Sequence, residues 1–165
     1  MSAGRASRVR FSVVMLLLVG LQFYVRPRLG NPHVAPDFLM LGLMIFAIRS
    51  RPGAAAFAGF LIGFASDALT PARFGAAMLA NTLVGYAAAW GRAVFFADNL
   101  LVNAGFIAVG VWLRDLLVLM ASGTGGKELA VQLGVWSPLM ALSTAVAGIV
   151  VLTVFRDWLD IRLEE

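Results

Sequence analysis

Apolar segments separated by short polar stretches make up most of this chain. Six segments can be drawn, at residues 9–25, 36–48, 53–69, 74–96, 100–121 and 135–158, and the stretches between them are rich in Pro, Gly or charge. The chain is 61% hydrophobic and 13% charged, whereas an average soluble domain is about 45–50% apolar and about 25% charged. A soluble core of 165 residues could not bury this much apolar surface. The sequence therefore predicts an all-α membrane protein, with six transmembrane helices in one bundle and a single domain over residues 1–165.

Two of the segments allow another interpretation. The first follows a basic tail and could be a secretory signal peptide, but no small-residue cleavage site follows it, and Gln22, Tyr24 and Arg26 favour a retained helix. Segments 36–48 and 53–69 are short and could form a hairpin that enters and leaves on one side. Such a hairpin would place Arg49 and Arg51 near the bilayer centre, at about 2.5–3.5 kcal/mol each. We therefore expect two true crossings.

The loop arginines and lysines predict the orientation. With the N-terminus in the cytoplasm, eight of them lie inside and four outside. The inner set is Arg5, Arg8, Arg10, Arg49, Arg51, Arg92, Arg156 and Arg162, and the outer set is Arg26, Arg28, Arg73 and Lys127. Because positive residues favour the cytoplasmic side, both termini are expected there.

A carboxylate and a guanidinium lie inside the apolar segments. Asp67 is fourteen residues after Gly53, and Arg114 is fourteen residues after Leu100. If both helices start at the cytoplasmic face, each charge lies about 21 Å into a hydrocarbon core of about 30 Å. Intramembrane charges usually pair or face a wet cavity, so we predict an Asp67–Arg114 ion pair. Asp115, rotated about 100° from Arg114 around the helix, is expected in a different environment.

This pair has two possible roles. It could serve only to hold helices together, or it could line a polar recess open to the outer side of the membrane. Segments 36–48 and 53–69 are too short to reach the outer surface of a full-thickness bilayer, which favours a recess. Asp37, at the outer start of segment 36–48, would then lie in the same recess.

The sequence GFLIGFASD, residues 59–67, places two glycines and the carboxylate on one helix face. Gly59, Gly63 and Asp67 are spaced four residues apart. Small residues at this spacing let two helix backbones approach closely in lipid. The segment is therefore predicted to be a central helix that packs closely against a neighbour and presents a charge at its outer end.

No catalytic constellation is visible. There are no cysteines, and the one histidine, His33, lies in a loop with no paired ligands in reach. SGTGGK, at residues 122–127, lacks the phosphate-loop spacing and is typical of a flexible linker. We therefore expect no enzyme activity, no metal site and no cofactor. The net charge of +4 does not indicate nucleic-acid binding, because the basic residues are scattered between apolar segments.

Four motifs within residues 34–90 follow the order and spacing of a known family. They are P-D-F at 36–38, G-F-x-x-G-x-x-x-D at 59–67, F-G at 74–75 and V-G-Y at 84–86. Together they closely resemble the MreD family of rod shape-determining proteins. The histidine that often follows the turn after Asp67 in relatives is absent here, where Met78 and Asn81 stand nearby.

The resemblance implies a fold and a set of partners. MreD proteins are small components of the bacterial inner membrane that associate with MreC and link cytoplasmic MreB filaments to the wall synthases. Those synthases are the polymerase RodA and its class B penicillin-binding transpeptidase. The resemblance also implies a fold similar to the S-components of energy-coupling-factor vitamin transporters. By resemblance, Asp37, Gly59, Gly63 and Asp67 are the positions expected to carry the family's function.

Two functions remain open. The first is a non-enzymatic membrane scaffold of the cell-elongation complex that binds an MreC-like protein. The second is a small-molecule-binding or transporter subunit of the S-component type. S-components commonly carry an alanine-rich motif on their first helix for the energising partner, and residues 11–25 contain no alanine. This difference favours the scaffold.

Overall fold

The computed structural model describes residues 3–68, 70, 73–95, 100–155 and 158. Every regular element in these ranges is helical, which confirms the all-α class. The elements are α1 (Ala3–Tyr24), the 3₁₀ turn η1 (Arg26–Arg28), α2 (Phe38–Arg49), α3 (Pro52–Ala68), α4 (Ala76–Phe95), α5 (Leu100–Ala121), α6 (Gly126–Val131), the π-helical turn η3 (Gln132–Trp136) and α7 (Ser137–Val154). The predicted helix ends at residues 69 and 96 lie outside the described residues, as does the chain from residue 156 onward apart from Trp158.

Within the residues that the structure describes, three helical stretches are long and apolar enough to cross a membrane. They are Arg8–Arg28, Leu100–Ala121 and Gly126–Val154. α2 and α3 are apolar but shorter; at 1.5 Å per residue, the 12 residues of α2 extend about 18 Å, less than a hydrocarbon core of about 30 Å. The described chain is thus helical, with three segments able to span a membrane by length and composition, and its six-span arrangement stays a prediction.

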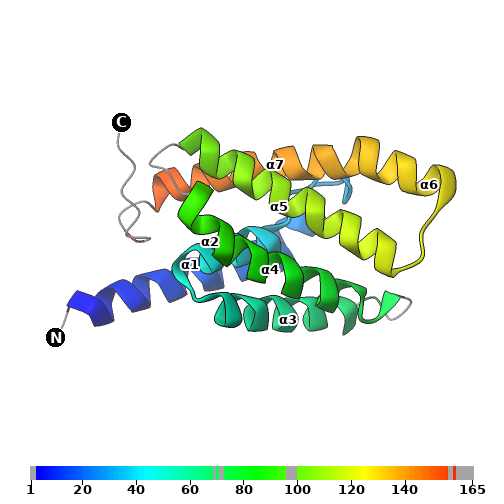
Figure 1. Ribbon diagram of the computed structural model, residues 1–165. Helices are drawn as coiled ribbons and strands as arrows, with labels where there is room; N and C mark the ends of the chain where they lie inside the picture. The colour runs from blue at the N-terminus through cyan, green and yellow to red at the C-terminus, as the bar shows by residue number, and fades with distance from the viewer. Residues whose placement is uncertain (1–2, 69, 71–72, 96–99, 156–157, 159–165) are drawn as a thin grey trace.

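The helices run alongside one another in a bundle (Figure 1). α1 begins and α7 ends at one end of this bundle, and α6 lies at the other (Figure 1). We call the second end, where α2 begins and α3 ends, the Asp37 end.

α2 occupies the centre of the bundle. It packs against α1, α3, α4, α5 and α7, and most of its side chains are buried, including Leu41, Leu43 and Ile45, each fully. Its sequence, FLMLGLMIFAIR, is apolar on every face before the final arginine. A helix with this composition is stable only when it is surrounded, so α2 forms the core on which the other helices pack.

The last helical stretch begins earlier than predicted. α6, η3 and α7 follow one another without a break from Gly126 to Val154, so the predicted start at residue 135 is wrong. The flexible linker predicted at residues 122–127 is also wrong in its last residues, because α6 begins at Gly126. Glu128 in the first turn of α6 favours a helix start there. The π-helical turn η3, around Gly134, joins α6 to α7.

Candidate functional site

Asp37 joins the start of α2 to two other helices. Its Oδ1 accepts a hydrogen bond from the Met40 N–H at 3.0 Å, which makes it the N-cap of α2. Its own N–H donates to Thr144 Oγ1 on α7 at 3.0 Å, and the next residue, Phe38, donates from its N–H to Gln22 Oε1 on α1 at 3.0 Å. Asp37 is only 2% exposed. A buried cap therefore holds α1, α2 and α7 together at the Asp37 end.

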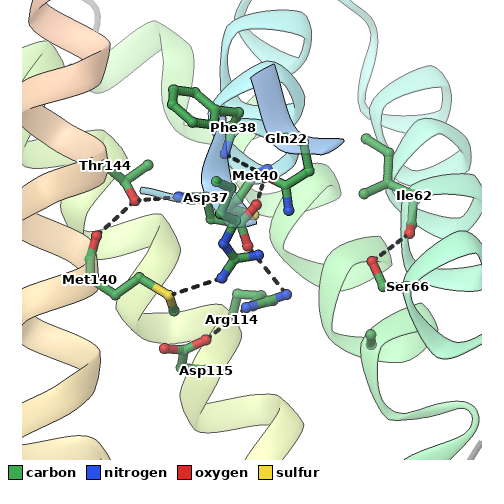
Figure 2. Close-up of polar contacts among 12 residues, drawn as sticks. Gln22, Asp37, Phe38, Met40, Ile62, Ser66, Arg114, Asp115, Met140 and Thr144 are labelled. Carbon is green, nitrogen blue, oxygen red and sulfur yellow. Dashed lines mark hydrogen bonds and ion pairs between the residues drawn. The ribbon is translucent and has the colours of Figure 1, made fainter. Parts of the chain in front are cut away.

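Arg114 brings a largely buried positive charge to this cap. Its Nη2 lies 3.4 Å from Asp37 Oδ2, and its Nη1 donates to Asp115 Oδ1 at 2.9 Å. Figure 2 shows Asp37 and Arg114 between Met140 and Thr144 of α7 on one side and Ile62 and Ser66 of α3 on the other. A guanidinium between two carboxylates offsets much of the desolvation cost of burying these charges. We call Asp37, Arg114 and Asp115 the charged cluster.

The predicted Asp67–Arg114 ion pair is wrong. Asp67 is 3% exposed and accepts three backbone hydrogen bonds at the start of α4, from the N–H groups of Gly75 at 3.0 Å, Ala77 at 3.1 Å and Met78 at 2.9 Å. The first N–H groups of a helix lack partners within the helix and carry partial positive charge, so a carboxylate is favourable there. Asp67 thus caps the start of α4, while the two Nη atoms of Arg114 contact other carboxylates.

The expected separation of Asp115 from Arg114 is wrong as well. The two residues are neighbours in sequence, and their Cα–Cβ bonds leave α5 in different directions. Their side chains nevertheless meet. The arginine side chain is long and its planar guanidinium presents five donors, so it reaches both Asp37 across the bundle and Asp115 beside it.

The two glycines of the 59–67 motif act as predicted. A Cβ atom added at Gly59 would overlap the backbone carbonyl of Asn81, and one added at Gly63 would overlap the backbone of Met78. Both contacts lie on α4, the helix whose start Asp67 binds. Gly85 on α4 likewise lets α3 come close, because a Cβ atom added there would lie 2.6 Å from the carbonyl oxygen of Ala55 on α3. One face of α3 therefore packs against α4 along its length.

A cavity of about 470 Å³ opens beside the charged cluster. Asp37 and Arg114 line it, as the predicted recess requires, but Asp67 is absent from its lining. Polar side chains missing from the prediction line it too, among them Gln22, Arg26, Ser66 and Asn81. We call this cavity the recess.

Sequence reasoning missed Gln22, Asn81 and Thr144. Each is a neutral polar residue inside an apolar segment, and this is the signal that could have identified them. Gln22 and Thr144 accept the N–H groups at the start of α2. Asn81, 2% exposed, has an Oδ1 atom without a hydrogen-bond partner. Within the described ranges, no three His, Cys, Asp or Glu side chains form a group that could hold a metal ion.

One comparison with known proteins gives a match. The family model described as "rod shape-determining protein MreD" matches residues 7–157, nearly the whole chain. No curated protein and no solved structure matches.

Proposed function

Because this chain belongs to the MreD family of rod shape-determining proteins, we propose that it is a non-enzymatic scaffold of the bacterial cell-elongation complex. Family membership and the three long apolar helices make it a membrane protein related to cell shape. The family match over residues 7–157 is the observation that carries the proposal. The charged cluster fits a structural role, since its one guanidinium pairs with two carboxylates inside the bundle.

The partner that we propose is an MreC-like protein. Many large apolar side chains of this chain face outward, including Leu16 on α1, Leu101 on α5 and Val146 on α7. In a membrane such surfaces contact lipid or the transmembrane helix of another protein. Through this partner the chain would associate with RodA, the class B penicillin-binding transpeptidase and MreB.

We further propose a single domain of six spans in the inner membrane, with a fold similar to the S-components. The start of α1 and the end of α7 lie at one end of the bundle (Figure 1), which supports an even number of crossings. By the positive-inside rule, both termini are cytoplasmic and the Asp37 end faces outward. In this arrangement Gly59, Gly63 and Asp67 fix α3 to α4, and Asp37 and Arg114 organise the outward-facing end.

Purification from native membranes tests the scaffold. A tagged chain extracted in mild detergent should bring down an MreC-like protein, identified by mass spectrometry. Cells depleted of the chain should become round and should recover their shape when the natural sequence is restored. Recovery of an ATP-hydrolysing transport complex in place of the MreC-like protein would contradict the proposal.

The recess favours a second candidate function, binding of a small molecule. Its volume of about 470 Å³ lies within the range of about 300–1,000 Å³ that is usual for ligand sites. This function corresponds to an S-component-like binding subunit. A scaffold can also hold a ligand, so the two functions are compatible.

A further inference from the structure

A second cavity, wholly apolar, lies next to the recess. It has a volume of about 170 Å³ and lies along α2, with lining side chains from α1 and α3. Leu39 and Ile62 line both cavities, so the two meet at these side chains. On α1, Val19 lines the apolar cavity and Phe23, one turn later, lines the recess. We call the apolar cavity the groove; recess and groove together are polar at the Asp37 end and apolar toward the middle of the bundle.

Arg26 offers the recess a positive charge with spare donors. In the described part of the chain, the contact of its guanidinium is Nη2 donating to Met140 Sδ at 3.7 Å. A thioether is a weak, uncharged acceptor. Arg114, by contrast, contacts both Asp37 and Asp115. Arg26 is therefore the cation of the recess that is free to bind an anion.

Asn81 offers the recess an acceptor. Its side chain is nearly fully buried, lines the recess, and has an Oδ1 atom without a hydrogen-bond partner. A buried polar atom in this state destabilises the protein until a donor reaches it. A ligand that carries a hydrogen-bond donor as well as a negative charge therefore complements both Asn81 and Arg26.

We propose that recess and groove together bind one anionic phospholipid with a hydroxylated headgroup, of the phosphatidylglycerol class. The phosphate contacts Arg26, a headgroup hydroxyl donates to Asn81 Oδ1, and an acyl chain lies in the groove between α1 and α3. A soluble anion would leave the groove unused. One turn of helix, with a 5.4 Å pitch and a diameter of about 10 Å, occupies roughly 420 Å³, so not even one turn of a partner helix fits in a groove of about 170 Å³. A hydrocarbon chain is narrower, and a stretch of its methylene groups fits there.

This inference deepens the second candidate function and does not depend on the scaffold function. It identifies the ligand of the recess as a lipid of the bilayer. The lipid would enter between α1 and α3. The MreC-like partner can be measured in the same preparations, so the two proposals fail separately.

Native mass spectrometry of the full-length chain in mild detergent tests the lipid. Titration with dioleoyl phosphatidylglycerol should give saturable binding of one equivalent. Its affinity should be at least about tenfold higher than that of dioleoyl phosphatidylcholine, because the latter lipid has no hydroxyl donor and no net charge. Arg26→Gln should weaken phosphatidylglycerol binding about tenfold, the size expected for a hydrogen bond to a charged group. Arg28→Gln is the matched control, because Arg28 lies exposed in the same 3₁₀ turn and outside the lining of both cavities.

A second pair of variants tests the groove. Ala58→Leu adds a side chain inside it and should weaken phosphatidylglycerol binding, while Ala87→Leu, at an exposed position on α4 outside both cavities, should not. Equal binding of the two lipids with no effect of Arg26→Gln would overturn the proposal. So would displacement of the lipid by inorganic phosphate at an equal concentration, because the ligand would then be a free anion. If Ala58→Leu removed the MreC-like protein and left lipid binding intact, the groove would belong to the partner and the proposal would be wrong.

Discussion

Arg114 lies between two carboxylates that are held in different ways. Asp37 is fixed by the cap that it forms on α2 and by its N–H bond to Thr144, whereas Asp115 is the chain neighbour of Arg114. Removing one partner from a buried group of charges leaves the remaining charge or charges without compensation. The cost of a substitution therefore depends on which charge is removed.

Arg114→Gln should destabilise the protein strongly. It leaves Asp37 and Asp115 buried without a cation, at a cost of about 3–5 kcal/mol. Asp37→Asn should cost less, about 1–2 kcal/mol, because asparagine also caps helices and Arg114 keeps Asp115. Thermal unfolding of the purified variants in detergent measures both. Equal losses of stability for the two variants would contradict this assignment of partners.

The direction in which a side chain points around its helix could not be predicted from the sequence. Counting residues placed Asp67 and Arg114 at similar heights, yet it gave no means of choosing among Asp37, Asp67 and Asp115 as the partner of the arginine. The donors that Asp67 binds lie eight to eleven residues further on, across a turn. That separation matches no local capping pattern such as the capping box.

At the scale of elements, α3 and α4 behave as one packed pair. Gly59 and Gly63 bring the two backbones together, and Asp67 binds the start of α4 at the end of the same helix face. Small-residue packing and a helix cap thus act on one interface. The glycine spacing predicted the close approach, but the identity of the packed neighbour needed the fold.

Asp67→Ala should destabilise this pair by about 2–4 kcal/mol, because it leaves three backbone N–H groups at the start of α4 without their acceptor. Asp67→Asn keeps one acceptor oxygen and should cost roughly half as much. Unfolding midpoints in detergent report the difference. Full stability of Asp67→Ala would show that the carboxylate does not hold α4.

Gly59→Ala should destabilise the protein by about 1–3 kcal/mol, because the added methyl group would overlap the backbone of Asn81. Gly105→Ala is the matched control, since nothing lies within 4 Å of a Cβ at this exposed helical position. The control should be neutral or slightly stabilising, as alanine favours helix over glycine. Parallel unfolding curves of the two variants check the prediction, and equal effects would contradict it.

At the scale of the whole molecule, helix positions could be predicted well and their lateral arrangement could not. Hydropathy, together with the Pro, Gly and charged residues between the apolar segments, predicted bounds close to those of α2 and α5. A lipid-exposed or buried helix must be apolar along its length. The recess could be predicted only as a consequence of the short helices. Its lining by Arg26 and Asn81 depends on how η1 and α4 lie around the start of α2, which no local pattern encodes.

The proposed topology can be tested by labelling, because the natural sequence contains no cysteine. Gly53→Cys and Gly125→Cys each place one thiol at an exposed position where a Cβ meets nothing within 4 Å. A membrane-impermeant maleimide added to intact cells, with the outer membrane permeabilised where one is present, should label the thiol at 125 and spare that at 53. Labelling at position 53 alone would reverse the orientation, and labelling at both positions would overturn the span assignment.

The most direct test of the charged cluster is a pair of double-mutant cycles on unfolding free energy. The cycle of Asp37→Asn with Arg114→Gln should give a coupling energy of about 1 kcal/mol or more, because the two side chains are in contact. The cycle of Asp67→Asn with Arg114→Gln should give less than about 0.5 kcal/mol, as expected for groups that have separate partners. A larger coupling for Asp67 than for Asp37 would contradict the arrangement of charges on which this account rests.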